Sequence, residues 1–314
     1  MKIKEQEYIL EGADKEFLLS APLLEVVSLA NKVRAESVGN EFELCNIINA
    51  KSGSCSEDCK FCAQSSRHKT DTPTYGLKSK AEIIAAAREA KAIGAKKFGI
   101  VTSGNGLDES ELDTIVEAIS EITNDVGIAV CGSLGALEKE PLVRLKNAGL
   151  VRYHHNIETS ANFYPEIVTT HSFDERVKTI TAAKEAGLEV CSGGIIGMGE
   201  SWQDRIDMAL LLKELDVDSV PINLLMPIAG TAMADMEVIS CEDAVRTICI
   251  FRVILRDKTI KIAAGREAIL KDFQALGFMA GANGMLIGGY LTVKGRSIDE
   301  DKQLVKEVEK LWAK

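Results

Sequence analysis

The sequence predicts an α/β protein: a (β/α)8 barrel of the TIM type with N-terminal capping helices and a C-terminal helix. After residue 40, short runs rich in β-branched residues alternate with longer stretches of helical periodicity. Glycine often ends a helix just before the next strand, as at Gly94, Gly149 and Gly187. Eight such units in about 270 residues are typical of a closed parallel barrel. A doubly wound open sheet is the competing architecture.

The predicted elements follow in chain order. The strands share β-branched runs and are expected at Leu44–Asn49, Lys97–Thr102, Ile128–Cys131, Val151–Asn156, Glu189–Gly194, Ser219–Leu225, Ile260–Ala263 and Met285–Gly288. The helices between them are expected at Ala81–Ile93, Glu109–Ile122, Phe173–Ala186, Trp202–Leu215, Glu242–Leu255 and Glu267–Ala275. We expect a single domain with a helical extension over 1–40 (helices within Leu18–Ala35), the barrel over 41–298 and a final helix over 299–314.

Composition limits the classes of partner. The 314 residues carry a net charge of −10, which argues against nucleic acid or an anionic membrane as a partner. No apolar run approaches the roughly 20 residues that span a bilayer, and the first residues are too polar for a signal peptide. Eight cysteines in such a chain suit ligands and core thiols better than disulfides. We therefore expect a cytoplasmic protein.

Cys55, Cys59 and Cys62 form the most informative motif, with the spacing C-x3-C-x2-C. Three thiolates suit three corners of a cubic iron–sulfur cluster and leave one iron open to a small molecule. Four ligands in two pairs would instead indicate structural zinc, and a zinc knuckle that borrows a distant ligand is the alternative. The motif follows the first predicted strand, where active sites of such barrels lie.

Other candidates occupy the predicted strand ends. Cys45, Cys131 and Cys191 lie in strands one, three and five, so their thiols converge on one lumen if they point inward. They either hold a second cluster or fill barrel layers as small residues. The segment 193–200 reads G-x-I-x-G-x-x-E and either approaches a flat ligand or serves only as a turn. Polar residues at four strand ends favour a polar ligand, and include His154, Asn156, Glu158, Asn223 and Arg266.

These motifs together resemble a known family. The three-cysteine loop, followed by Ala63-Gln64, resembles the signature of the radical S-adenosylmethionine (SAM) superfamily. Several longer runs resemble the biotin synthase family within it, and the resemblance extends from about residue 40 to 310. These runs are Ser54–Ser66, His155–Arg176, Val190–Glu200, Ser219–Asn223, Ala264–Glu267 and Phe278–Asn283.

The resemblance implies an activity and a set of cofactors. It implies sulfur insertion into dethiobiotin, with hydrogen abstracted at two carbons by SAM-derived radicals and sulfur supplied by an auxiliary iron–sulfur cluster. It also implies an electron-donor protein such as flavodoxin or ferredoxin, and a homodimer. A related radical SAM enzyme of the maturase or mutase type, acting on another small molecule, is the alternative. A non-enzymatic iron–sulfur carrier or zinc-stabilised scaffold is a further one.

The resemblance also assigns roles to residues of this chain. Cys55, Cys59 and Cys62 would hold the SAM-binding [4Fe–4S] cluster. SAM itself would contact a set comprising Phe61, Asn156, Glu158, Arg176, Ile195, Gly197 and Gly199. The substrate would contact a set comprising His154, Asn156, Asn223, Thr292 and Val293. An asparagine amide suits a ureido ring because both offer donors and an acceptor.

One departure from the family pattern concerns the auxiliary cluster. The family has cysteines on strands two, three and five together with an arginine, for which Cys131, Cys191 and Arg266 are the expected matches. The strand-two position is Gly99 in this chain, and strand one carries Cys45. Neighbouring strands lie only about 4.8 Å apart, so we expect Cys45 to replace the missing ligand. Both a [2Fe–2S] and a four-iron cluster remain open.

Overall fold

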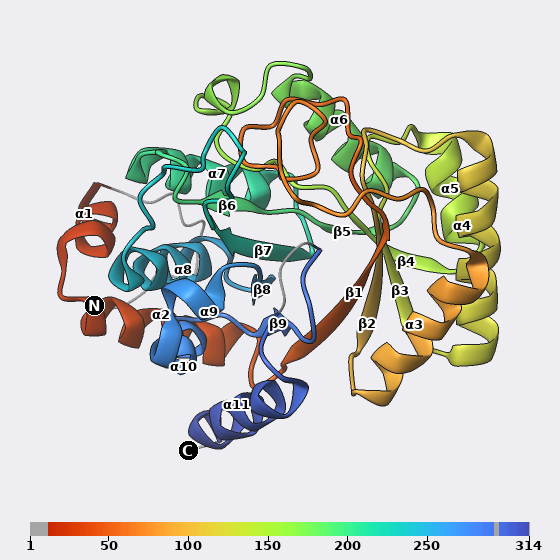
Figure 1. Ribbon diagram of the computed structural model, residues 1–314. Helices are drawn as coiled ribbons and strands as arrows, with labels where there is room; N and C mark the ends of the chain where they lie inside the picture. The colour runs from red at the N-terminus through yellow and green to blue at the C-terminus, as the bar shows by residue number, and fades with distance from the viewer. Residues whose placement is uncertain (1–11, 292–294, 314) are drawn as a thin grey trace.

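The computed structural model describes residues 12–291 and 295–313, and its centre is a closed parallel barrel (Figure 1). The sheet runs in the order β5-β4-β3-β2-β1-β9-β8-β7-β6 and closes because β5 and β6 both pair with β7. The predicted barrel is therefore confirmed. The strands are β1 Glu43–Lys51, β2 Lys97–Thr102, β3 Ala129–Ser133, β4 Leu150–His154, β5 Glu189–Cys191, β6 Gly194–Ile196, β7 Ser219–Leu224, β8 Thr259–Ile262 and β9 Gly284–Leu286.

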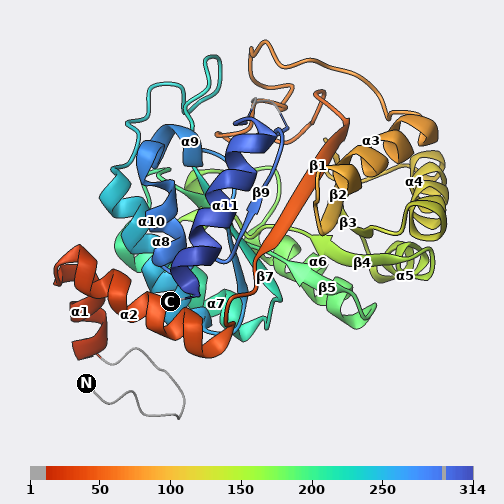
Figure 2. The ribbon, with the colours of Figure 1, turned by 90° about the horizontal axis from the view of Figure 1, so that it is seen from below.

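Helices surround the barrel, and most are crossover connections between neighbouring parallel strands (Figures 1 and 2). They are α3 Lys80–Ala92, α4 Glu109–Glu121, α5 Lys139–Asn147, α6 Phe173–Glu185, α7 Trp202–Glu214, α8 Cys241–Leu255, α9 Arg266–Ile269 and α10 Gln274–Met279. The N-terminal α1 Gly12–Ser20 and α2 Leu23–Ser37 pack against α8. The C-terminal α11 Ile298–Trp312 packs against α10.

Local sequence signals explain where several helices begin. Ser79, Ser172 and Ser297 each cap a helix whose third residue is glutamate, and both hydrogen bonds of the capping box form. Asp108 and Ser201 make the same reciprocal pair with Glu111 and Asp204. Each box satisfies backbone N–H groups that would otherwise lack partners in the first turn. The capping boxes therefore fix the residue at which each of these helices begins.

The structure corrects three predicted elements. The predicted helical span Leu18–Ala35 is divided at Pro22 into α1 and α2. The predicted helix Glu267–Ala275 is interrupted after α9 by a 3-10 turn, where Lys271 adopts a positive φ of 47°. The fifth strand is broken into β5 and β6 at Gly193, where a Cβ would lie 2.0 Å from the Pro221 carbonyl oxygen.

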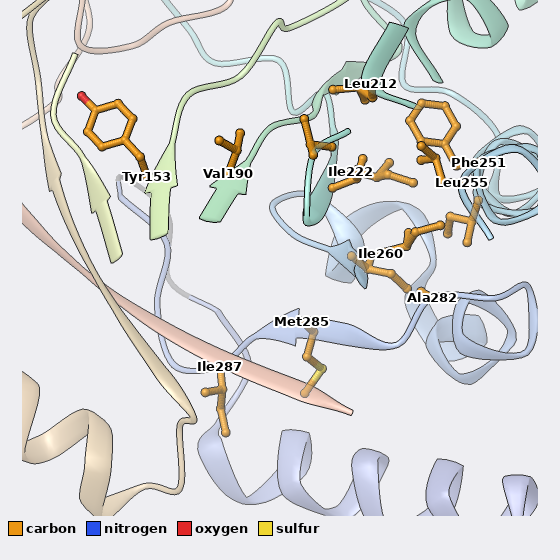
Figure 3. Close-up of a cluster of buried hydrophobic side chains, with 14 of the residues drawn as sticks. Tyr153, Val190, Leu212, Ile222, Phe251, Leu255, Ile260, Ala282, Met285 and Ile287 are labelled. Atoms are coloured by element: carbon orange, nitrogen blue, oxygen red, sulfur yellow. The ribbon is translucent and has the colours of Figure 1, made fainter. Parts of the chain in front are cut away.

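The apolar core lies between the barrel and its helices. Figure 3 shows Ile222 of β7 and Ile260 of β8 with Phe251 and Leu255 of α8, and all four are buried. The residues that alternate with these along each strand face the barrel lumen instead. The packed outer layer therefore fixes which side chains enter the lumen.

We expect Gly194→Ala to destabilise the barrel by about 1–3 kcal/mol, because the added methyl group meets backbone that cannot easily move. A Cβ at Gly194 would lie 2.2 Å from the Glu158 carbonyl oxygen. Gly76→Ala is the matched control, since nothing lies within 4 Å of its Cβ position. Urea unfolding of both variants measures the difference, and equal midpoints would contradict the prediction.

Candidate active site

The three-cysteine loop leaves the carboxyl end of β1 and folds back on itself. Cys55 donates its backbone N–H to Gln64 (3.1 Å) and accepts one from Ser66 (2.7 Å). The Cys62 N–H bonds the Cys59 carbonyl at 3.0 Å, so the last two ligands share a tight turn. These bonds bring the thiols of a continuous loop together at the active-site end of the barrel.

Asp58 fixes this loop to the segment that precedes α6. Its carboxylate accepts from the backbone N–H and the hydroxyl of both Thr169 and Thr170. The Lys60 N–H adds a bond to the Ile167 carbonyl at 3.0 Å. The hydrogen bonds outweigh partial burial and hold the pKa of Asp58 well below its usual range. The carboxylate stays charged and anchors the loop.

The electrostatics of the loop fit a cationic cluster. Burial raises the pKa of Cys59 to about 12; Arg176 opposes the rise, and neighbouring Cys62, Glu158 and Cys55 add to it. A metal cluster relieves this repulsion by binding the thiolates. Across the described ranges, no three His, Cys, Asp or Glu side chains are already arranged to hold a metal ion, so the loop thiols would draw together when they bind a cluster.

The residues predicted to bind SAM lie beside the loop. Glu158 accepts from the Asn156 side chain (3.2 Å), and its Oε1 lies 3.9 Å from Nη1 of Arg176. Arg176 also donates to the Tyr164 hydroxyl at 2.7 Å. Burial opposes the charge of Arg176, but Glu158 and Tyr164 outweigh it and raise its pKa. A charged carboxylate and guanidinium therefore stand side by side, as a zwitterionic ligand requires.

His171 joins the same network, which the sequence did not indicate. Its Nδ1 lies 2.9 Å from the Tyr164 hydroxyl, and its Nε2 lies 4.0 Å from the Cys59 sulfur. Arg176 Nη2 is 3.2 Å from the same Nε2. A histidine far along the chain from its neighbouring cysteine carries no local signal of this contact.

The glycine motif after β5 divides into two parts. Ile195 lines the central cavity. Gly197 and Gly199 adopt φ values of 100° and 102° in a turn, and Glu200 accepts from the Gly197 N–H at 2.9 Å. Neither glycine lines the cavity, so the structure supports the turn alternative for them.

One cavity of about 470 Å³ connects the barrel mouth with its interior. Phe61 of the cysteine loop, Asn156 and Glu158 line its upper part. Three cysteines on separate strands line it further in, and they are Cys45, Cys131 and Cys191. The predicted convergence of these thiols on the lumen is confirmed.

The strand cysteines differ in charge state. Burial raises the pKa of Cys131 to about 12, and Cys45 adds to the rise. Burial would also raise the pKa of Cys191, but Lys261, His154 and Arg152 outweigh burial and lower the pKa of this thiol to about 6. All eight cysteines of the chain are free of disulfides. The donor set therefore fits an iron–sulfur cluster, with cations close by.

Lys261 of β8 contacts one of these sulfurs directly. Its Nζ lies 3.1 Å from the Cys45 sulfur and 2.6 Å from Glu43 Oε1. The signal was present in the sequence: Lys261 stands between Ile260 and Ile262, where a buried strand rarely holds a charge. Arg152 in β4 is a second such residue, flanked by Val151 and Tyr153.

Arg266 does not join the cysteines, contrary to the prediction. It begins α9, and its Nη2 is 2.8 Å from both carboxylate oxygens of Asp301 on α11. Its Nε donates to the Tyr290 hydroxyl at 3.0 Å. The side chain is 1% exposed and ties α9 to the C-terminal helix. It acts as a structural arginine outside the cavity.

The remaining predicted residues are placed as follows. Asn223 and His154 line the cavity, as expected for substrate contacts. Gly99 also lines it, and a Cβ there would lie 3.0 Å from a methyl carbon of Ile47. A strand-two cysteine would therefore require Ile47 to shift. Thr292 and Val293 lie outside the described residues.

Comparison with known families identifies the class of protein. The Radical SAM superfamily profile matches residues 51–212, and the Biotin and Thiamin Synthesis associated domain matches 221–309. Among solved structures, methylornithine synthase superposes with a TM-score of 0.81 at 23% identity, over 97% of this chain and 93% of that one. The hydrogenase maturase HydG of Carboxydothermus hydrogenoformans also gives 0.81, at 17% identity over 95% and 74%. The fold and loop are those of a radical SAM enzyme.

Curated relatives specify the family further. Biotin synthase of Pelotomaculum thermopropionicum is 46% identical over 97% of this chain and 93% of its own length. That of Thermotoga neapolitana is 52% identical over 87% and 98%. The chain belongs to the biotin synthase family.

We expect Asp58→Ala to lower the iron content of the purified protein several-fold, because the loop loses its anchor on Thr169 and Thr170. Ser56→Ala is the control, since its exposed hydroxyl makes only a 3.5 Å contact with Glu57. Iron is measured by chelation after anaerobic reconstitution. Equal iron in both variants would contradict the anchoring role.

Proposed function

We propose that the protein converts dethiobiotin to biotin by radical SAM sulfur insertion. The observation that supports this most strongly is the single cavity that runs from Phe61 beside the cysteine loop to Cys45, Cys131 and Cys191. A substrate held there lies between two sulfur-rich sites, one suited to SAM and one suited to a sulfur donor. A related maturase or mutase would leave the three strand cysteines without a role.

The first site would be built from Cys55, Cys59 and Cys62. When bound, the [4Fe–4S] cluster and SAM supply hydrogen abstraction from unactivated C–H bonds. The chain contributes orientation: Arg176 and Glu158 offer opposite charges to the zwitterionic part of SAM, and Ile195 offers an apolar wall. Gly197 and Gly199 support this wall by allowing the turn that follows it.

The second site would be built from Cys45, Cys131 and Cys191, with Lys261 in place of the predicted Arg266. Its cluster would provide the sulfur atom, and both the [2Fe–2S] and the four-iron forms remain compatible with three thiolates. An ammonium group 3.1 Å from Cys45 stabilises negative charge on a thiolate ligand. The Lys261 side chain is 5% exposed, so this interaction is little screened by solvent.

The substrate ring would lie between Asn156 and Asn223. The Asn223 amide accepts from the Ala264 N–H and donates to the Gly194 carbonyl, each at 3.2 Å. Asn156 is held in the same way by the Gly193 N–H at 3.1 Å. Each fixed amide keeps further hydrogen-bonding capacity for a urea. The roles of Thr292 and Val293 at the substrate carboxylate stay predictions.

We further propose flavodoxin or ferredoxin as the electron donor. Lys60, Arg67 and Lys69 are exposed beside the cysteine loop of an otherwise acidic chain. An acidic carrier would be attracted to this face.

The cytoplasm is the proposed location, because free thiols need a reducing compartment. No helix of the described part of the chain has the length and apolar character to cross a membrane. The homodimer stays a prediction.

We expect Cys59→Ala to abolish reductive cleavage of SAM, because two thiolates cannot hold the first cluster in place. The measurement is 5′-deoxyadenosine formed under dithionite. Cys241→Ala is the control, since Cys241 lies on α8 away from the cavity. Persistent 5′-deoxyadenosine in the Cys59 variant would refute the assignment of this loop.

We expect Cys45→Ala to lose the second cluster and biotin formation while it retains SAM cleavage. The reason is that Cys45 supplies the ligand that Gly99 does not. Iron and acid-labile sulfide per chain, followed by product analysis with dethiobiotin, measure this. Retention of a full second cluster and of biotin formation would overturn the replacement hypothesis.

A further inference from the structure

Beneath the strand cysteines, one carboxylate gathers three cations. Glu43 of β1 lies 2.6 Å from Lys261 of β8, 2.7 Å from Arg152 of β4 and 2.8 Å from Lys97 of β2. Four strands therefore meet at a single carboxylate, and we call Glu43, Lys261, Arg152 and Lys97 together the floor hub.

The floor hub contacts one of the proposed sulfur ligands, Cys45, directly. Lys261 Nζ bridges Glu43 Oε1 and the Cys45 sulfur, at 2.6 and 3.1 Å. The Cys45 thiol is itself 3.5 Å from Glu43 Oε1. A free lysine side chain has several rotamers, and the ion pair restricts it to one that faces the sulfur.

Glu43 and Glu189 both pair with Lys97 and Arg152, but their side chains differ in how far they are exposed to solvent. The Glu43 side chain is 15% exposed and Lys261 is 5% exposed. Glu189 is 46% exposed, and its ion pairs are with Arg152 and Lys97 rather than with Lys261. A charge removed at Glu43 therefore acts through a less screened medium than one removed at Glu189.

We infer that Glu43 is a positioning residue that holds the Lys261 ammonium against Cys45 and so sets the electrostatic environment of the auxiliary cluster. This inference rests on the proposed auxiliary site. A negative charge near a cluster disfavours the added electron, and a hydrogen bond or cation at a sulfur ligand favours it. The charge of Glu43 itself disfavours the added electron, but the ammonium that Glu43 directs to Cys45 favours it and acts at the shorter distance, 3.1 Å against 3.5 Å from the sulfur.

The test uses the Cys59→Ala background, in which remaining iron belongs to the auxiliary site. Glu43→Gln keeps the shape of the side chain and removes its charge. We expect iron and sulfide per chain to be retained and the midpoint potential, followed by spectroelectrochemical titration, to become more negative, because the Lys261 ammonium is no longer held at Cys45. Glu189→Gln is the matched control with the same loss of charge, but its ion pairs are with Arg152 and Lys97, and we expect a clearly smaller shift.

Lys261→Met tests whether Glu43 acts through the lysine. Alone it is expected to move the potential in the negative direction. When Lys261→Met is present, adding Glu43→Gln should produce a smaller shift than it does alone. The combined variant also serves if Glu43→Gln alone does not fold, because it leaves no unpaired ammonium in the barrel. If the midpoint potential of the combined variant equals that of Lys261→Met, the inference is supported.

The outcomes separate the two proposals. If Cys59→Ala protein retains no iron after reconstitution, the auxiliary site itself is refuted, and the role of Glu43 with it. If iron is retained but Glu43→Gln and Glu189→Gln shift the potential equally, or the shifts of Glu43→Gln and Lys261→Met add, only the positioning role is overturned.

Discussion

The ion pairs between Glu43 and its three cations are the interaction on which the interior of the barrel depends. Charged groups are costly to bury unless they are paired. Here the pairing joins β1, β2, β4 and β8 across the lumen, so the cations are held directly below the cysteines. The same carboxylate that makes burial of Lys261 tolerable also directs its ammonium at Cys45. Glu43 therefore both compensates the buried charge of Lys261 and places that charge beside the Cys45 sulfur.

Much of the architecture was accessible from local patterns. Periodicity located the barrel strands, and capping residues such as Ser79 and Ser172 mark helix starts through contacts only three residues long. The break in the fifth strand was not accessible, because it depends on the Pro221 carbonyl of the neighbouring strand. Long-range contacts of this kind leave no periodic signal.

The site shows the same limit. The three-cysteine loop is a local motif, and its position followed from the strand before it. Arg266 and Lys261 are five residues apart, and only Arg266 was predicted from the sequence to lie beside the strand cysteines. Arg266 instead pairs with Asp301 on the last helix, whereas Lys261 pairs with Glu43 on the first strand and faces the cysteines. An arginine at a strand end attracts attention, whereas a lysine between two isoleucines resembles an ordinary interruption of the core.

Strand β1 connects the two sites as one rigid element. It carries Cys45 near its start, ends at Lys51, and leads directly into the loop that holds Cys55 (Figure 1). A strand rises about 3.3 Å per residue, so the six steps from Cys45 to Lys51 span about 20 Å. The strand is hydrogen-bonded to β2 and β9 on its two sides and cannot shorten. Strand β1 therefore fixes the separation between the cysteine in the barrel interior and the cysteine loop at its mouth.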